Sequence, residues 1–252
     1  MYERAAGDKI VPSDLRPPPV LKRTLDYLFH DLMPTHGFSA TYNFVRDRSR
    51  SVRNDFTMQL ETGSLAMECN ERCARFHILA LHVQRRIPGY SGDLDEQQLM
   101  NSLQTLKEFY MDQRGRYESP NELEMRIYHR LIHIRDQRER HDDIPTAIQT
   151  HPVFLLTTRF RERVQEISSP IRKKSPLKVD AKAMEVFAEL VSVLREAGNA
   201  AMVYLVACIL EWHFGPDTIE DIESIRGNLS YSEIIDSEPN VGAGDDAGAE
   251  EA

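Results

Sequence analysis

Apolar residues recur along most of this chain at the three- and four-residue spacing of amphipathic helices. The stripe Tyr42, Val45, Val52, Phe56 and Leu60 is one example. Prolines, glycines and capping residues bound stripes of this kind. Together these signals predict eight helices, at about residues 19–32, 39–60, 64–83, 95–110, 120–134, 153–167, 179–197 and 200–214.

Local signals set the expected ends of these helices. The first helix should stop before Pro34, and Ser39 should cap the second. Asp95 with Gln98 resembles a capping box that opens the fourth helix. In Ser119-Pro120-Asn121-Glu122 the serine is predicted to cap, the proline to take the first helical position and the glutamate to reach back.

No segment alternates apolar and polar residues as a half-buried strand would, and no Asn-Gly hairpin signal occurs. Helices joined by short loops pack as antiparallel pairs, so we expect an all-α helical-repeat fold, a TPR/PCI-like α-solenoid. The expected organisation is an extended lead-in over residues 1–14, a helical domain over residues 15–214, and an acidic, mostly disordered tail over residues 215–252.

Charge separates the body of the chain from its end. The net charge is −9, but the segment from Glu211 onward holds 12 acidic residues and one base, whereas the first 210 residues are nearly neutral. No apolar run is long enough for a membrane span, so we expect no membrane insertion, and the first residues do not resemble a secretory signal. Three cysteines give no disulfide framework and fit a reducing compartment.

Candidate catalytic and metal-binding groups are few. Cys69, Cys73 and His77 share one helix face, but the outer two are about 12 Å apart along the axis, too far for one zinc ion. His129 and His133 lack the glutamate of a zinc hydrolase motif, which leaves a metal hydrolase as a disfavoured hypothesis. Neither a phosphate-binding loop nor a nucleophile elbow is present, so we predict no enzyme, no metal and no cofactor.

Basic residues gather in the second helix, where Arg46, Arg50 and Arg53 are expected on one face and Arg48 lies nearby. Two interpretations stay open for these four arginines. They form either a structural ion-pair face, with Asp47 and Asp55 as partners, or a contact surface for phosphates or an acidic partner.

A second basic run lies further along the chain. Arg159, Arg161 and Arg163 precede a linker that carries two Ser-Pro pairs and the bases Arg172, Lys173, Lys174 and Lys178. This linker is either a solvated loop or a segment that faces nucleic acid or acts as an import signal.

Several segments resemble a known family. Residues 12–28 contain Leu15-Arg16-Pro17-Pro18-Pro19, residues 44–59 contain Asp47-Arg48-Ser49-Arg50-Ser51-Val52-Arg53-Asn54-Asp55-Phe56-Thr57, and two further motifs are Asn70-Glu71-Arg72-Cys73-Ala74-Arg75-Phe76-His77 and Glu118-Ser119-Pro120-Asn121-Glu122. Together, over about residues 12–136, they resemble the conserved domain of the SAC-three/GANP family.

This resemblance implies a non-enzymatic helical-repeat scaffold, followed in full members by a winged helix that is not evident here. It implies a TREX-two-like assembly for mRNA export at the nuclear pore, with localisation in the nucleus and at the nuclear envelope. The implied partners are a PCI-domain protein, a small acidic proteasome-lid-type protein, nuclear pore components and, through a composite surface, mRNA. The alternative is a helical subunit of another PCI-type assembly: the proteasome lid, a translation-initiation factor or a splicing-linked elongation complex.

Overall fold

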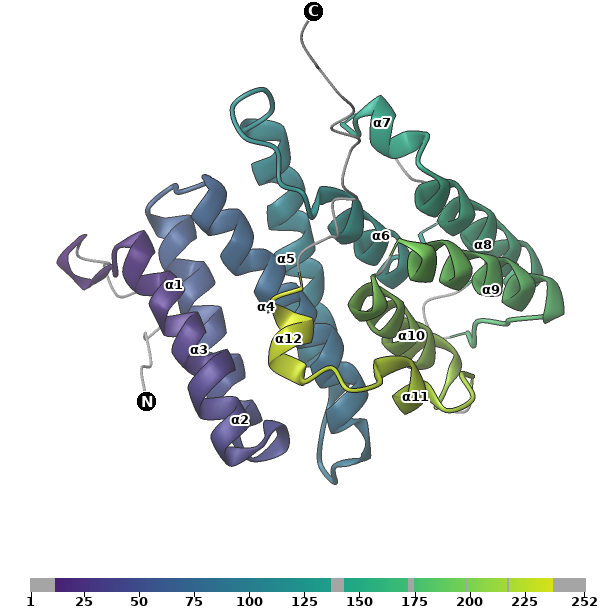
Figure 1. The fold of residues 1–252 in the computed structure, drawn as a ribbon, viewed down its shortest axis with the longest axis horizontal. Coiled ribbons are helices and arrows are strands. Elements are labelled where there is room, and N and C mark those ends of the chain that lie inside the picture. Colours follow the sequence, from purple (N-terminus) through teal and green to yellow (C-terminus); the bar gives the residue numbers. More distant parts are fainter. Residues whose placement is uncertain (1–11, 137–142, 172–174, 198, 217, 238–252) are drawn as a thin grey trace, which may run out of the picture. The chain divides into compact units, whose positions relative to one another are not determined.

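The computed structural model describes residues 12–136, 143–171, 175–197, 199–216 and 218–237 (Figure 1). Every regular element within these residues is helical, which confirms the predicted all-α class. The chain divides into two compact units, Met1–Ser119 and Pro120–Ala252, called unit 1 and unit 2 below, where the sequence indicated one helical domain. Residues 1–11, most of the predicted lead-in, lie outside the described residues.

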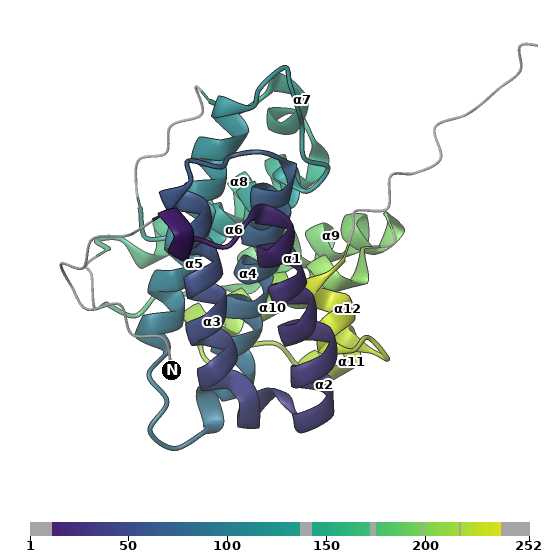
Figure 2. The same cartoon turned by 90° about the vertical axis from the view of Figure 1, so that its left-hand side faces the viewer.

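Unit 1 is built around three long helices. Its elements are η1 (Pro12–Asp14), α1 (Pro18–Asp26), η2 (Tyr27–Leu32), α2 (Met33–His36), α3 (Phe38–Met58), α4 (Ser64–Val83), η3 (Gln84–Arg86) and α5 (Gly92–Asp112). Helix α4 packs against α1, α3 and α5, and α1 and α3 run side by side (Figures 1 and 2).

Pro34 does not end the first helix, contrary to the sequence prediction. The helical path continues through α2 to His36. A proline inside a regular α-helix removes one backbone hydrogen bond and clashes with the carbonyl group four residues earlier. Here η2, just before the proline, is a π-helical stretch, whose backbone hydrogen bonds are spaced differently. We infer that this altered spacing makes room for the proline ring.

Both ends of α3 also differ from the sequence prediction. The N-cap is Gly37 and not Ser39; its φ of 87° is one that glycine adopts readily. At the other end Leu60 lies beyond the helix with a φ of 53° and is 86% exposed, so it does not belong to the buried stripe. The other members of that stripe are buried.

Helix α4 is enclosed on nearly all sides, since almost every residue from Ala66 to His82 is buried. Phe76 stands at the centre of an aromatic cluster, with its ring centroid 5.6 Å from that of Phe29 and 5.5 Å from that of Phe38. Polar residues of α4 are buried along with the apolar ones, so the hydrogen bonds that they make are to other residues of the unit.

Unit 2 contains α6 (Glu122–Ile132), α7 (Thr146–Gln149), α8 (Pro152–Ser168), α9 (Ala181–Glu196), α10 (Ala200–Phe214), α11 (Ile222–Arg226) and α12 (Tyr231–Ile235). Helices α8 and α9 pack against each other, and α10 contacts α6, α9, α11 and α12. Residues 201–211 of α10 are all buried, as its almost wholly apolar sequence predicted.

Two helices, α11 and α12, lie within the predicted acidic tail. A capping box formed by Ser230 and Glu233 starts α12, and Ile234 and Ile235 are fully buried. The segment up to Ser237 is therefore folded, because a few isoleucines within the acidic sequence supply apolar surface to bury. Residues 238–252 lie outside the described residues.

The start of α6 is simpler than the sequence predicted. The helix begins at Glu122 with Asn121 as its N-cap, and no side chain caps it. Ser119 instead donates its hydroxyl hydrogen to Glu71 in unit 1, at 2.6 Å. No described helix combines the length and the apolar character that a membrane crossing requires.

His213, near the end of α10, is a half-buried titratable residue of unit 2. Its Nε2 lies 3.0 Å from the backbone oxygen of Leu131, which the neutral ring satisfies by donating Nε2–H. Burial lowers the pKa of His213 to about 4, below the ordinary value of about 6.5.

Unit 2 should therefore lose stability as the pH falls from about 6.5 to about 4, because the unfolded chain binds a proton at His213 that the folded chain excludes. The loss should reach roughly 1–3 kcal/mol from this group. The free energy of unfolding of unit 2 at each pH is measured by denaturant unfolding, followed by the fluorescence of Trp212, the single tryptophan of the chain. A His213→Gln variant keeps an N–H donor and should show a flatter pH dependence; equal slopes for the two chains would contradict the assignment.

Candidate interaction surface

The four arginines of α3 do not form a free basic face. Arg53 is buried and donates from Nη2 to Gln98 on α5, and burial lowers its pKa. Arg46 is half-buried and donates from Nη1 to the hydroxyl of Tyr42 at 2.9 Å. Two of the predicted contact residues thus serve the interior of unit 1.

The other two arginines lie closer to solvent. Arg48 pairs with Asp47 at 2.6 Å, and its guanidinium lies 5.8 Å from the ring centroid of Phe44. The Arg50 side chain is exposed and makes no hydrogen bond or ion pair with any residue that the structure describes. Among the four, Arg50 is the one available to an external phosphate or carboxylate.

Tyr42 belongs to a buried polar cluster centred on Asp95. The Asp95 carboxylate accepts hydrogen bonds from the hydroxyl of Tyr42, from Nδ1 of His77 at 2.8 Å and from the hydroxyl of Tyr90 at 2.9 Å. These residues come from α3, α4, α5 and the segment before α5. We call Tyr42, His77, Tyr90 and Asp95 the Asp95 cluster.

The protonation states of the Asp95 cluster follow from its geometry. Burial lowers the pKa of His77, so the ring is neutral and its Nδ1–H donates to Asp95. Burial alone would raise the pKa of Asp95, but hydrogen bonds from His77, Tyr42 and Tyr90 outweigh it and hold that pKa below its ordinary value. The cluster is thus one carboxylate held by three neutral donors.

Sequence reasoning missed this role of Asp95. Helix α5 begins three residues earlier, at Gly92, and Asp95 is fully buried in its first turn instead of capping it. One signal was present, because Asp95 continues the stripe of Leu99, Leu106 and Tyr110 by one helical turn. A carboxylate on an apolar stripe indicates a buried, paired group.

Further polar contacts anchor the Arg-Pro-Pro segment to α3. Arg16 donates from Nε to Asp55 at 2.8 Å and from Nη2 to Ser51 at 2.9 Å. In return, Gln59 donates from Nε2 to the backbone oxygen of Arg16 at 2.9 Å. Asp55, Ser51 and Gln59 all lie in the motif of residues 44–59 and hold the start of unit 1 in place.

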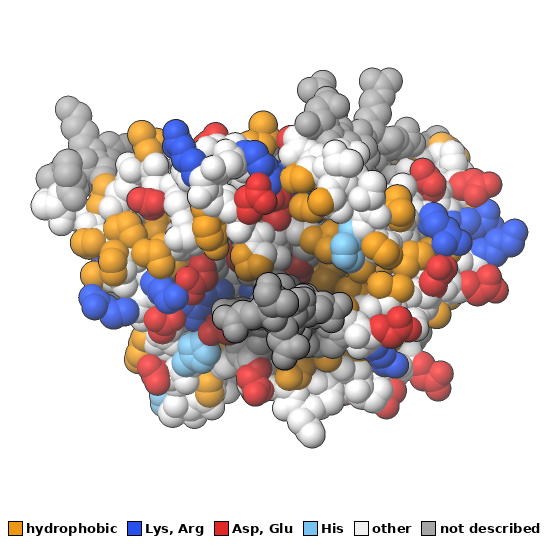
Figure 3. All heavy atoms as spheres, turned by 45° about the horizontal axis from the view of Figure 1, so that its top comes forward, with side chains coloured by type: hydrophobic (Ala, Val, Ile, Leu, Met, Phe, Trp, Pro, Cys, Tyr) orange, Lys and Arg blue, Asp and Glu red, His pale blue; other side chains and the backbone are white. Residues whose placement is uncertain are grey.

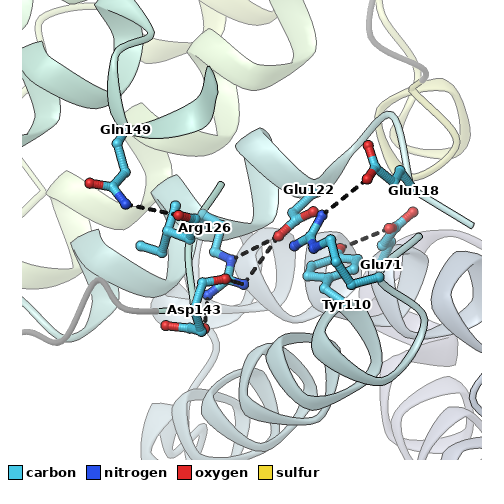
Figure 4. A network of polar contacts seen from close by, with 9 residues as sticks. Glu71, Tyr110, Glu118, Glu122, Arg126, Asp143 and Gln149 are labelled. Carbon is cyan, nitrogen blue, oxygen red and sulfur yellow. Dashed lines mark hydrogen bonds and ion pairs between the residues drawn. The ribbon is translucent and has the colours of Figure 1, made fainter. Parts of the chain in front are cut away.

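The motif of residues 70–77, on α4, also faces the interior of unit 1. Glu71 accepts hydrogen bonds from Tyr110 at 2.8 Å and from Ser119, and Figure 4 shows the Tyr110 contact. Arg72 pairs with Asp26 of α1 at 2.7 Å. Ion pairs and hydrogen bonds of this kind fix how the helices sit against α4.

The basic residues of α8 are likewise used inside unit 2. Arg161 is buried and donates to the backbone oxygens of Arg130 and Asp136, so it caps the C-terminal end of α6. Arg163 pairs with Asp180, and Arg159 with Glu189 at 3.2 Å.

Asp143, in the loop that precedes α7, is a partner of the buried Arg126. It accepts from Nη1 of the buried Arg126 at 2.5 Å, while Nη2 of the same arginine donates to Glu122 at 3.1 Å (Figure 4). Gln149 donates to the backbone oxygen of Ile144 at 2.8 Å and holds the same loop.

The basic linker is described in part. Arg172, Lys173 and Lys174 lie outside the described residues. Lys178 is exposed, and its backbone N–H donates to the hydroxyl of Ser168 at 2.8 Å. On the face drawn in Figure 3, lysine and arginine side chains lie in small groups with acidic ones beside them.

Of the candidate metal-binding side chains, Cys69, Cys73 and His77 are buried, and the half-buried rings of His129 and His133 lie 4.5 Å from each other between centroids. Cys69 and Cys73 are buried, and burial raises the pKa of Cys73 to about 11 and that of Cys69 further still, so both are neutral thiols. Within the described part of the chain, no three His, Cys, Asp or Glu side chains are grouped so that they could hold a metal ion.

The comparison with protein families identifies this architecture. The model of the SAC3/GANP family matches residues 1–222, which include all of unit 1 and most of unit 2. The chain belongs to the SAC3/GANP family. The resemblance inferred from the sequence motifs is confirmed, and family membership supports, at the level of the family, a scaffold related to mRNA export.

Three relatives show how the match is distributed. The chain is 34% identical over 215 residues to SAC3 family protein 1 of Schizosaccharomyces pombe, with 83% of this chain and 21% of that protein covered. It is 30% identical over 182 residues to Protein xmas of Drosophila melanogaster, with 66% and 9% covered. It is 24% identical over 237 residues to SAC3 family protein B of Arabidopsis thaliana, with 87% and 13% covered. The chain thus spans about a fifth of the length of these relatives or less.

The Asp95 cluster gives a direct test of the structural role assigned to it. Asp95→Asn removes the charge and one acceptor, leaving buried donors without a partner, and should lower the free energy of unfolding of unit 1 by about 2–4 kcal/mol. Denaturant unfolding followed by circular dichroism measures the change. Asp93→Asn, on the exposed side of the same turn, is the matched control and should stay within about 0.5 kcal/mol of the parent. Equal losses for both variants would show that Asp95 does not hold the helices together.

Proposed function

We propose that this chain is a non-enzymatic scaffold of a TREX-two-like mRNA-export complex associated with the nuclear pore. In this proposal it binds a PCI-domain protein and a small acidic proteasome-lid-type protein, and the joint surface contacts mRNA. The observation that carries the proposal is the match of the SAC3/GANP family model to residues 1–222.

The internal contacts support a rigid platform. Residues of the family motifs are largely used inside unit 1: Arg16 and Asp55 bind each other, Arg53 binds Gln98, and Glu71 binds Tyr110. A framework fixed in this way presents stacked helices without rearrangement, which favours docking of a partner at low entropic cost. Helical-repeat proteins expose extended surfaces suited to that use.

The cellular location follows from the proposed complex. An mRNA-export scaffold acts in the nucleus and at the nuclear envelope, where it would meet components of the nuclear pore. The alternative assemblies, namely the proteasome lid, translation-initiation factors and splicing-linked elongation complexes, differ in partners and in location. Affinity purification of the tagged chain from nuclear extract, followed by mass spectrometry, separates these outcomes.

Association with the PCI-domain partner is the first test of the scaffold. Co-expressed with the PCI-domain protein and the small acidic protein of the same organism, the chain should elute with both in one peak on size-exclusion chromatography. Stable interfaces bury about 1,200–2,000 Å², enough to survive the column. Separate elution of the three proteins at micromolar concentration would contradict the proposal. Recovery of proteasome-lid or translation-initiation subunits from extract would instead favour the alternative.

Arg50 provides a test for contact with RNA. In the complex with the partner proteins, Arg50→Ala should weaken binding of a mixed-sequence single-stranded RNA roughly 2- to 5-fold, as expected for one exposed ionic contact. The dependence of log K on log salt concentration should fall by about 0.7, because one phosphate contact is lost. Fluorescence anisotropy over a salt series measures both quantities.

Arg195→Ala is the matched control, since Arg195 is an exposed arginine of unit 2 outside the family motifs. Its affinity for RNA and its salt slope should equal those of the parent complex. Unchanged values for Arg50→Ala would remove Arg50 from the RNA-contacting surface, while leaving the test of partner association unaffected.

A further inference from the structure

Phe44 is the aromatic residue of α3 that the core of unit 1 does not use. It is 52% exposed, whereas Phe38, Tyr42 and Phe56 of the same helix are buried. Its ring stacks on no other aromatic residue that the structure describes. Single exposed apolar side chains are common on protein surfaces, so the neighbours of Phe44 decide whether it belongs to a site.

An ion pair one helical turn further along holds the Phe44 ring. The guanidinium carbon of Arg48 lies 5.8 Å from the centroid of the ring, within the range of a cation–π contact. Nε and Nη2 of Arg48 both donate to Asp47, at 3.0 Å and 2.6 Å. The carboxylate therefore orients the guanidinium, and the guanidinium supports the ring. Because Asp47 neutralises Arg48, that arginine serves to order the ring more than to attract a phosphate.

The rest of the exposed face of α3 is polar and carries no unpaired acid. Asn43 and Asn54 are exposed, and their amides make no hydrogen bond with any residue that the structure describes. Arg50, also exposed, is the free base of this face. Both aspartates of the helix accept hydrogen bonds from arginines. Next to the ring, the face thus offers two amides, one free guanidinium and a positive net charge.

This composition suits a single strand of RNA better than a helix of a partner protein. A partner helix needs a contiguous apolar face, but the next exposed apolar residue of α3 is Met58, about 21 Å further along the axis. Unpaired bases stack on aromatic rings, and phosphates bind arginine. Phe44 and Arg50 are separated by about 9 Å along the axis and a third of a turn around it, so one strand can lie across both.

We propose that the exposed face of α3 binds single-stranded RNA, with an unpaired base stacked on Phe44 and a phosphate of the same strand on Arg50. Arg48 is a positioning residue, since it acts through the ring that it supports. The inference rests on the proposed function in taking RNA as the ligand, and it adds which chemical group is contacted. Bases inside an A-form duplex are stacked on one another, so a duplex does not offer that group.

The test measures the affinity for three labelled RNAs by fluorescence anisotropy, with the full chain alone and in complex with the two partner proteins. The RNAs, each about 12 nucleotides long, are an adenosine strand, the same strand without bases, and a duplex. Phe44→Ala should weaken binding of the adenosine strand roughly 5- to 20-fold, as expected for one stacked base, and leave the other two affinities unchanged. Arg50→Ala should weaken both single strands by the same factor, because it removes a phosphate contact.

Further variants separate stacking from apolar contact. Phe44→Trp keeps an aromatic ring and should bind the adenosine strand at least as tightly as the parent chain. Phe44→Leu keeps most of the apolar surface without a π-face and should lose as much affinity as Phe44→Ala. Met58→Ala is the matched control, since Met58 is 51% exposed on the same helix, and it should bind all three RNAs like the parent. All these positions are exposed, so the fold should be kept, which circular dichroism checks.

The role of Arg48 has its own variant. Combining Asp47→Asn with Arg48→Gln removes the ion pair at constant net charge. The combination should weaken binding of the adenosine strand roughly 2- to 5-fold, the effect expected for loss of a cation–π contact. The affinity for the strand without bases and the dependence on salt should stay unchanged. A parallel loss for both strands would mean that Arg48 does not act through the ring.

Several results would overturn the proposal. Phe44→Ala might as well be silent, or it could weaken both single strands equally; either result excludes base stacking on Phe44, as does full affinity of Phe44→Leu. Absence of RNA binding by the parent, both alone and in the complex, excludes the site altogether. Phe44→Ala should still elute with the partner proteins; loss of that association with unchanged RNA affinity would show that the face binds protein. If the parent itself does not elute with those proteins, the proposed complex fails, and the measurements on the chain alone still decide the role of Phe44.

Discussion

The enclosure of α4 is the constraint on which unit 1 depends. In a helix buried on nearly all sides, pairing of the charged and strongly polar groups decides stability, because a satisfied hydrogen bond contributes only about 1 kcal/mol whereas an unsatisfied buried one costs about 1–3 kcal/mol. His77 therefore needs Asp95, Glu71 needs Tyr110 and Ser119, and Arg72 needs Asp26. These pairings join α4 to α1, to both ends of α5 and to Ser119, and Asp95 in turn binds Tyr42 of α3. Together they specify how α1, α3 and α5 lie against α4. Apolar contacts alone, being non-directional, would not fix these positions.

Arginine has the same role in both units. Its planar group offers several donors and remains charged when enclosed, so one side chain can join two backbone oxygens or two carboxylates. Arg161 closes the end of α6 in this way, Arg126 joins Glu122 to Asp143, and Arg16 joins Ser51 to Asp55. A cluster of arginines in the sequence was therefore no measure of positive surface potential. Of the four arginines on α3, Arg50 is exposed and its side chain has no partner in the described part of the chain. Binding of nucleic acid by the other three would compete with the contacts that their side chains already make.

The long helices could be predicted from the sequence because they depend on spacing within one segment. α4 and α10 begin and end at the residues that the pattern indicated. The wrong predictions of helix caps involve residues whose partners are distant in sequence. Asp95 binds Tyr42, which is 53 residues away, and Ser119 binds Glu71, which is 48 residues away. In each case the local pattern offered a plausible cap, and a tertiary contact prevailed. The prediction that the first helix stops before Pro34 was wrong for another reason, since no simple sequence signal indicates the π-helical stretch that accommodates the proline. For the candidate surface, charge was predictable from composition, but exposure was not.

The hydrogen bond from the Lys178 backbone to the Ser168 hydroxyl has an evolutionary implication. It joins two points that are ten residues apart and so brings the ends of the connection between α8 and α9 together, whatever lies in the middle. Closing a longer connection costs little, about 0.6 kcal/mol for each doubling of its length. Insertions at this point would leave the α8–α9 pair intact, so that new recognition sequences could be acquired or lost there in different lineages without refolding the helices on either side.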